Sequence, residues 1–412
     1  MQSNVQANHR NQIRRLRYTA LAVTGLLLAF NGDAQTIAVA LEQAWSRNPQ
    51  AVTFVARAAE AKARADLAAS FTPTVPSISI SNASDRVNAE SGKDAWELEL
   101  AVPLWLPGQR SARTLESANA ATEVQSRQVA LRLQLAGELR EAWWALSGAR
   151  LTVDLAQRRA SAARALESDV MSRFNAGELA RTDANLAQNE RFLAEGELLE
   201  AKSVLLQAEQ TYRLLTGANA PVSLTEETVA TLSISDSMHP QLAAAQAVEQ
   251  LAQARLGVAE KTRRDAPELA LRVVRDRGDF NTPYANSFGV KLTIPFSSDA
   301  RVRQERSAAL VEVTQAQAET VQVKQRIELD EVRARQGVEL AQLQLLKAQE
   351  RLKVASDSLT LAEKAFSLGE SDLATLLRAR HSAFEAEAFV NRQKLACSLS
   401  VSRLNQSLGV LP

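Results

Sequence analysis

Residues able to carry chemistry are scarce in this chain of 412 residues. Its three histidines, His9, His239 and His381, lie far apart, and Cys397 is its one cysteine. No pair of these residues has the spacing of a metal site, and a single cysteine excludes an internal disulfide. The sequence also lacks a Gly-rich phosphate loop, a Ser-His-Asp order and a nucleophile elbow. It therefore predicts no enzyme, no resident metal and no other cofactor.

The most specific local pattern is a turn that occurs twice. It reads FNAGELARTDANLAQ at 174–188 and FSLGESDLATLLRAR at 366–380. In each copy a Phe is followed three residues later by a Gly, and Gly tolerates the positive φ that ends a helix in a tight reversal. Phe174 and Gly177 thus correspond to Phe366 and Gly369.

The two turns belong to two similar halves of the chain. Several residues of the first half match residues about 192 positions later, in the same order. The matches are Asn48-Pro49 with His239-Pro240, Trp96 with Phe288, Pro103 with Pro295, and Gly217 with Gly409. This order predicts an internal tandem repeat. We expect a first repeat at 35–217, a polar connector at 218–237 and a second repeat at 238–412.

The N-terminus has the pattern of an export signal. Basic residues from Arg10 to Arg17 precede an apolar run from Tyr18 to Phe30, which is shorter than the about 20 residues that span a bilayer. We therefore expect a signal peptide at 1–34, and a retained membrane anchor is the competing reading. The formal net charge of +1 argues against nucleic acid as a partner.

Each half contains two short segments that alternate between apolar and polar residues: VPSISISNAS, DAWELELAVP, PELALRVVRD and NSFGVKLTIP. A period of two predicts strands with one buried face, here four strands per chain. Their length and pattern are typical of outer-membrane strands, with one face toward lipid and the other toward a wet lumen. The predicted lipid-facing residues are Ile78, Ile80, Trp96, Leu98, Leu100, Leu269, Leu271, Val290 and Leu292. A soluble four-stranded sheet packed on helices is the alternative.

The rest of the sequence is typical of long helices. Hydrophobic residues make up 46% of the chain but aromatic residues only 5%, and Gly and Pro are few. We expect helices at 108–174 and 299–366, each about 100 Å long, and further helices at 182–216 and 375–408. Leu345, Ala348, Leu352, Ala355, Leu359, Ala362 and Phe366 repeat at steps of three and four residues, which predicts a coiled-coil seam.

Together these features resemble the outer-membrane efflux protein family, the TolC-like exit ducts, over residues 35–412. The family's turn has an aromatic residue, a Gly three residues later and then Asp-x-x-x-Ala. The first turn matches with Phe174, Gly177, Asp183 and Ala187, and the second with Phe366, Gly369 and Ala379, while Thr375 occupies the Asp position. The phrases VPLWLPGQRSAR and LTIPFSSDARVR are closest to the heavy-metal (cobalt, zinc, cadmium) branch.

Four strands cannot close a barrel, and unpaired strand edges in hydrocarbon are unfavourable, so several copies must share one barrel. The residues alone permit two, three or four copies. The resemblance implies a homotrimer that is mainly α-helical, with a 12-stranded transmembrane β-barrel continued by a long coiled-coil helical barrel. It places the protein in the bacterial outer membrane, extending into the periplasm.

The implied function is the exit duct of a tripartite efflux system. The two turns would dock a periplasmic adaptor, which links the duct to an inner-membrane pump of the resistance-nodulation-division type. The substrates would be heavy-metal cations or small toxic compounds. A duct for type I protein secretion and a non-transporting periplasmic coiled coil are the alternatives.

One departure from the family concerns the closed mouth of the duct. Some members narrow it with acidic residues at the Asp position of the second turn and three residues later, where this chain has Thr375 and Arg378. An acidic ring is therefore not expected here. Arg378 and Asp372 are the candidate gate residues, and Arg378 either repels cations, pairs with Asp372 or Glu370, or is an ordinary solvated or interhelical residue.

Overall fold

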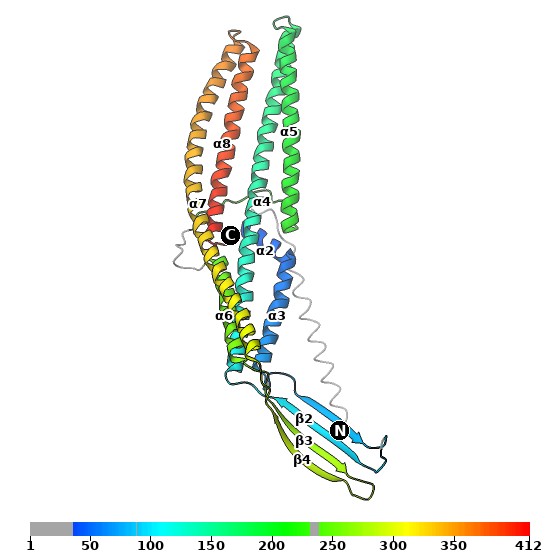
Figure 1. The fold of residues 1–412 in the computed structure, drawn as a ribbon. Coiled ribbons are helices and arrows are strands. Elements are labelled where there is room, and N and C mark those ends of the chain that lie inside the picture. The colour runs from blue at the N-terminus through cyan, green and yellow to red at the C-terminus, as the bar shows by residue number, and fades with distance from the viewer. Residues whose placement is uncertain (1–35, 88, 231–238) are drawn as a thin grey trace, which may run out of the picture.

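The computed structural model describes residues 36–87, 89–230 and 239–412 (Figure 1). The predicted signal peptide at 1–34 lies outside the described residues, as does the end of the predicted connector. No described helix is both long enough and apolar enough to cross a membrane.

Two series of elements follow one another along the chain. The first comprises α2 (Ile37–Arg47), α3 (Pro49–Ala69), β1 (Ser77–Ser84), β2 (Asp94–Pro103), α4 (Gln109–Asn175) and α5 (Arg181–Thr216). The second comprises α6 (Pro240–Lys261), β3 (Glu268–Arg277), β4 (Ala285–Thr293), α7 (Asp299–Ser367) and α8 (Leu373–Ser407). From α3 onward the two series have the same order of helices and strands. The predicted long helices and strands are confirmed, whereas α2, α3 and α6 were not among the helices predicted by range.

The molecule is an elongated rod (Figure 1). All four strands lie at one end, and the α4–α5 and α7–α8 turns lie together at the opposite end. The distance between the ends follows from α4 and α7, which have 67 and 69 residues and so extend about 100 Å each. This arrangement separates the strand residues from the turn residues into two distant regions.

Helices α3 and α6 begin in the same way with different residues. Asn48 accepts a hydrogen bond from the Gln50 N–H through Oδ1 (2.8 Å), and His239 accepts one from the Gln241 N–H through Nδ1 (3.2 Å). A Pro follows each cap, at a position where no helical N–H is needed. Burial lowers the pKa of His239, which favours the neutral imidazole that can accept this bond.

Helix α4 lies at the centre of the layer of helices. Near the sheet it packs against α3 and α6, and toward the turns it packs against α5 and α8. Helix α7 lies at the edge of the same layer, against α6 and then α8. Small residues allow the close approach of α4 and α5: Ala156, Ala160, Ala163, Ala194 and Ala201 form a buried seam. The pair α4–α5 forms the first arm and the pair α7–α8 the second. In the second arm Ala348, Ala355 and Phe366 of the predicted seam are buried.

The largest core lies midway along the rod, around α2, α4 and α5. Trp143 and Trp144 are buried there and donate their indole N–H groups to the Thr225 carbonyl (3.3 Å) and to Ser402 Oγ (2.7 Å). Both tryptophans thus serve the packing of the helices. Tyr212 lies beside Trp143, with ring centroids 6.1 Å apart.

A buried arginine fixes the connector to this core. Arg140 pairs with Glu227 (Nη2 to Oε1, 2.8 Å) and also donates to Gln406 (2.6 Å) and to the Val410 carbonyl (3.0 Å). The Arg140 guanidinium is thus both ion-paired and hydrogen-bonded within the fold, as a buried charge requires. Sequence reasoning missed this contact, because Arg140 is one of many arginines on a long helix.

Candidate functional site

The strands form one antiparallel sheet in the order β1-β2-β3-β4. Cross-strand partners lie on the same face of a sheet, so the register decides which side chains are grouped. Ile80, Leu98, Val273 and Phe288 form one row, and Ile78, Leu100, Leu271 and Val290 form the next. Leu269 and Leu292 continue the same face toward the helices. The nine predicted lipid-facing residues therefore share one face.

This apolar face is open to the surroundings. Ile78 and Ile80 are each 70% exposed, and the other seven predicted lipid-facing residues are also exposed. Phe288, which was not among the nine, is 83% exposed on the same face. No described helix packs against the sheet. The alternative of a soluble sheet packed on helices is thus contradicted. A contiguous apolar face of this size on a protein surface indicates a contact with lipid or with another protein.

The opposite face of the sheet is polar. Ser79, Ser81 and Ser287 lie on it, and ion pairs cross between strands from Glu97 to Arg272 (3.2 Å) and from Glu99 to Lys291 (3.6 Å). Alternation of exposed apolar and polar side chains along every strand suits an environment that is apolar on one side and wet on the other.

The two outer strands leave their outer backbone groups unpaired. Strand β1 pairs only with β2, and β4 pairs only with β3, among the described elements. Within a hydrocarbon layer such open edges are unfavourable by several kcal/mol per group. In such a layer the sheet would therefore need further strands at both edges.

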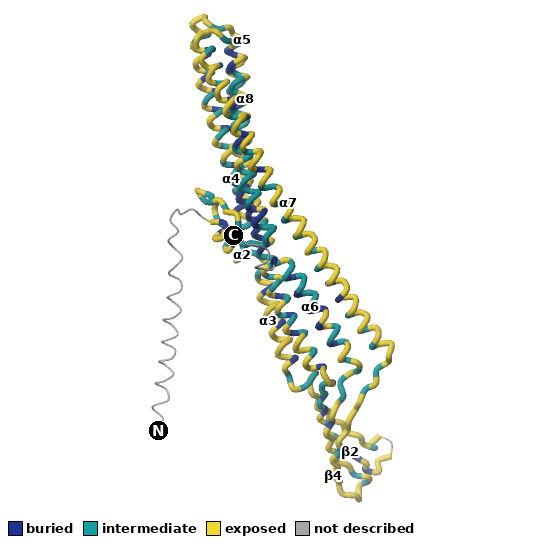
Figure 2. The backbone as a smooth tube through the Cα atoms, turned by 90° about the vertical axis from the view of Figure 1, so that its left-hand side faces the viewer, coloured by how far each residue is buried: buried dark blue, intermediate teal, exposed yellow. Residues whose placement is uncertain are grey.

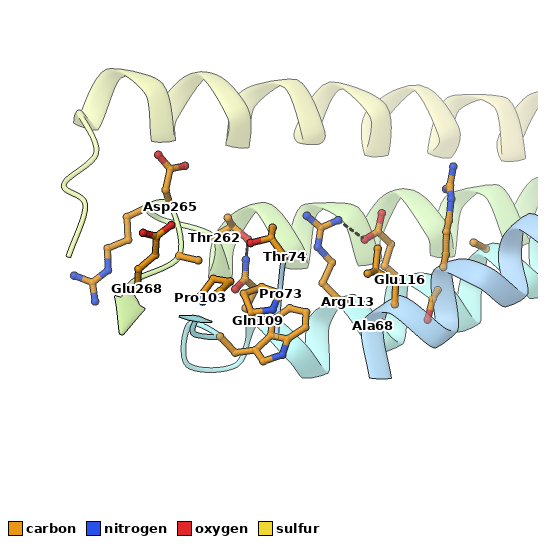
Figure 3. A pocket seen from close by; sticks show the side chains of 17 residues that line it. Ala68, Pro73, Thr74, Pro103, Gln109, Arg113, Glu116, Thr262, Asp265 and Glu268 are labelled. Atoms are coloured by element: carbon orange, nitrogen blue, oxygen red, sulfur yellow. Dashed lines mark hydrogen bonds and ion pairs between the residues drawn. The ribbon is translucent and has the colours of Figure 1, made fainter. Parts of the chain in front are cut away.

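A cavity of about 600 Å³ lies where the sheet joins the helices (Figure 3). Pro103 and Glu268, partners on the polar face of the sheet, contribute to its wall. On the helical side of the cavity, Gln109 of α4 donates to Thr262 (3.3 Å), and Arg113 pairs with Glu116 (3.2 Å). The polar face of the sheet thus continues into a recess of mixed charge along the helical layer.

At the other end of the rod the two repeated turns have the same geometry. In the first, the Gly177 N–H donates to the Phe174 carbonyl (2.9 Å) and the Glu178 N–H to the Arg173 carbonyl (2.9 Å). In the second, the Gly369 N–H donates to the Phe366 carbonyl (3.1 Å), and the next N–H likewise reaches back five residues. This is the Schellman motif, and it requires the positive φ of 80° at Gly177 and 74° at Gly369.

The sequence-predicted turn residues fall into an inner and an outer group. Ala187 and Phe366 are buried, in a cluster with Leu166, Val170, Ala184, Leu373 and Leu376 that joins the two arms. Phe174 packs against this cluster, and the Arg173 guanidinium lies 5.3 Å from the centre of the Phe366 ring. Gly177, Gly369, Thr375, Arg378 and Asp372 are exposed, whereas Asp183 and Ala379 are half-buried. The spacing of the motif did not reveal this division.

The first turns of α5 and α8 are capped differently. Asp183 accepts from the Ala180 N–H (3.2 Å) in the first arm. In the second arm the cap is Asp372, which accepts from the Thr375 N–H (2.9 Å). Since Asp372 caps the helix from the N-cap position, Thr375 can replace the Asp of the motif without loss of a capping group.

Arg378 lies on the surface beside this cap. Its Nη2 donates to Thr375 Oγ1 (2.9 Å) and its Nε to the Ala374 carbonyl (3.3 Å). It forms no ion pair within the described residues, so the suggested pair with Asp372 or Glu370 is absent there. The Thr375 hydroxyl and backbone and the charge of Arg378 lower the pKa of Asp372. The exposed second turn therefore carries adjacent positive and negative charges.

Residues 232–410 match the family model described as outer membrane efflux protein. The predicted resemblance to this family is confirmed. The description of this family names the outer membrane, in agreement with the predicted localisation. The sequence matches no curated protein closely enough to count as a relative.

Solved structures of outer-membrane proteins share the fold over nearly the whole chain. The outer membrane protein VceC of Vibrio cholerae is 16% identical, with a TM-score of 0.75 over 91% of this chain and 96% of its own. The CmeC outer membrane channel of Campylobacter jejuni is 16% identical, with a TM-score of 0.73 over 93% and 90%. CusC, described in work on transmembrane channel formation, is 15% identical, with a TM-score of 0.75 over 93% and 96%.

Proposed function

We propose that this chain is one protomer of a trimeric exit duct in the outer membrane, which passes solutes from an inner-membrane pump and a periplasmic adaptor to the exterior. The observation that carries the proposal is the open, one-sided sheet at the end of a rod of helices. Its apolar face fits lipid, its polar face fits an aqueous lumen, and its edges require further strands.

The edges of the sheet and of the helical layer lie on corresponding sides. Strand β1 follows α3, and β4 leads into α7, and these two helices flank α4 and α6 in the layer. A copy that joins its β4 and α7 to the β1 and α3 of the next copy forms a head-to-tail contact. Such a contact closes into a ring when the rotation between copies is a whole fraction of a turn.

The outward side of α7 carries a stripe suited to such a contact. Leu310, Val321, Val332, Leu343 and Val354 are all exposed and follow one another at a spacing of about 11 residues. This spacing corresponds to about 3.67 residues per turn, so the residues lie in a nearly straight line along the helix. Figure 2 shows α7 as exposed along much of its length. The neighbouring copy would cover this stripe.

Three copies would supply twelve strands, enough to enclose an aqueous channel. The polar sheet face and the recess of Figure 3 would then line the conducting path. The helical barrel would carry this path across the periplasm, and both turns would lie at its inner end.

The turn end fits the contact with a periplasmic adaptor. Buried Ala187 and Phe366 would hold the two arms together, while the exposed polar residues near Gly177 and Gly369 would meet the partner. The adaptor would connect the duct to a pump of the resistance-nodulation-division type. We propose heavy-metal cations or small toxic compounds as substrates, which a duct conducts without ligands of its own.

The proposal is tested by reconstituting the purified protein in planar lipid bilayers. We expect a trimer in detergent and discrete conductance steps in the bilayer. The matched variant Leu343→Glu should lose both, because a carboxylate would enter the apolar seam between copies. A monomer without conductance would overturn the proposal. Export of a large protein by the host strain, with unchanged tolerance to metals and toxic compounds after deletion, would favour type I secretion.

A further inference from the structure

The apolar face of the sheet ends in a group of polar and aromatic residues near the strand loops. Beyond the row of Ile80 and Phe288, the next row on the same face contains Asn82, Trp96, Arg275 and Asn286. Asp94 and Arg277 are cross-strand partners in the row after that. Two arginines of β3 thus lie directly above the apolar residues and on the same side of the sheet.

Both guanidinium groups pack on one tyrosine. The Arg275 and Arg277 guanidinium carbons lie 4.9 Å and 4.8 Å from the centre of the Tyr284 ring, and that of Arg277 also lies 5.4 Å from the Phe280 ring. Stacking on aromatic rings holds a guanidinium in place and leaves its N–H edges available for hydrogen bonds. It also brings two like charges close together, an arrangement that a bound anion would stabilise.

Neither arginine is hydrogen-bonded to a carboxylate within the described residues, although Arg277 attracts the Asp94 carboxylate at longer range. Neither guanidinium forms an ion pair there, and Arg277 Nε is buried without a hydrogen-bond acceptor. Arg272 provides the contrast on the same strand, since it lies on the polar face and pairs with Glu97 (3.2 Å). The N–H groups of Arg275 and Arg277 on the apolar face are therefore available to a ligand, whereas Arg272 on the polar face is already ion-paired.

One carboxylate lies nearby, but it is already bound. Asp94 accepts from the Tyr284 hydroxyl (2.8 Å) and from the Asn82 amide (2.8 Å), one bond to each oxygen. These bonds orient the tyrosine ring on which the arginines stack. With two arginines and one aspartate, this part of the face retains a net positive charge.

We propose that Arg275 and Arg277, held on Tyr284, bind the phosphate group of an anionic lipid. A planar guanidinium matches phosphate with two parallel hydrogen bonds, and two such groups suit one lipid headgroup. The position fits because these residues adjoin the apolar rows, at the depth where headgroups meet acyl chains. Trp96 in the same region is a residue type enriched at that depth. The inference rests on the proposed function, which places the apolar face in the membrane.

The test uses the full-length protein in vesicles and its tryptophan fluorescence. Of the five tryptophans, Trp96 is the one in the sheet, and its share of the signal is the difference between each protein and the same protein with Trp96→Phe. Brominated phosphatidic acid is mixed with brominated phosphatidylcholine, and the quenching of tryptophan emission gives the preference for one lipid over the other. We expect the wild-type protein to prefer phosphatidic acid by about fivefold or more. The double variant Arg275→Gln with Arg277→Gln should lose this preference. Arg272→Gln should keep it, because that arginine lies on the other face.

Equal lipid preferences in the double variant and in Arg272→Gln would overturn the inference. So would loss of the preference when inorganic phosphate is added, since the site would then bind the free anion. Bilayer conductance is measured on the same preparations. If the wild-type protein conducts but shows no lipid preference, only this inference fails. If it neither conducts nor inserts into vesicles, the proposed function fails as well.

Discussion

Helices α4 and α7 occupy equivalent positions in the two halves of the chain and have almost the same length, 67 and 69 residues. Yet α4 buries side chains along most of its length, whereas α7 buries only Val313, Ala316, Ala341, Ala348, Ala355 and Phe366. Fully buried Trp143 of α4 corresponds by the sequence shift to Arg335 of α7, which is exposed and paired with Glu331 (2.8 Å). The central helix completes its packing within the chain, whereas the edge helix leaves an exposed face, which another copy would cover in the proposed assembly.

The largest expected effect concerns the central helix. Leu139→Ala in α4 removes a fully buried side chain, so we expect a loss of about 2–5 kcal/mol in the free energy of unfolding. Leu340→Ala is the control in α7, where the side chain is exposed, and we expect a change within about 0.5 kcal/mol in the isolated protomer. Urea denaturation followed by circular dichroism measures both. Similar losses in the two helices would remove the distinction between centre and edge.

The edge helix should affect assembly instead of folding. Val332→Glu places a carboxylate in the exposed stripe of α7, and we expect at least a tenfold weaker association, about 1.4 kcal/mol, with helical content unchanged. Asp330→Asn serves as the control, because Asp330 is exposed and lies about 160° around the helix from Val332. Analytical ultracentrifugation in detergent measures the association. A variant that assembles normally would show that this stripe faces no copy.

The two turns provide a comparison in which no difference is expected. Gly177→Ala and Gly369→Ala force alanine to a positive φ, and no other atoms lie near enough to add a clash at either site. We therefore expect the same cost in both arms, about 1–2 kcal/mol. Thermal unfolding of the two variants measures it. A much larger loss in one arm would show that the two turns are not equivalent in stability.

The cap of α8 should respond to acid. Hydrogen bonds from Thr375 lower the pKa of Asp372, so its contribution to stability is present above the unfolded-state pKa and is lost as the pH falls through the lower folded-state value. Amide hydrogen exchange in the first turn of α8 should therefore accelerate below about pH 4. In Asp372→Asn this acceleration should be absent. An unchanged acid response in the variant would assign it to another group.

The fold was largely predictable because its signals are local. Periods of two and of three to four residues located the strands and the long helices, and the paired Phe and Gly located both Schellman turns. What could not be predicted depends on distant partners. The Arg140 bond to Glu227 joins residues 87 positions apart, and nothing near Arg140 in the sequence indicates it.

The site was predictable only in part, for a related reason. Alternation assigned the lipid-facing residues to one side of each strand, and the observed register places them on one common face. The turn motif gives the spacing of its residues but not their burial, so it does not distinguish buried Ala187 from exposed Thr375. The stacking of Arg275 and Arg277 on Tyr284 needed the pairing of β3 with β4, which alternation along one strand does not reveal.

The most direct test of the account is a cross-link between the open edges of the sheet. Ser79→Cys in β1 and Ser287→Cys in β4, in a Cys397→Ser background, lie three strand spacings apart and in different rows within one chain, at least about 14 Å. A thiol linker of shorter reach can therefore join them only between copies. The account predicts a ladder of cross-linked chains that ends at three, and neither single variant should give it. Chains that remain single, with both thiols reactive in the membrane, would contradict the shared barrel.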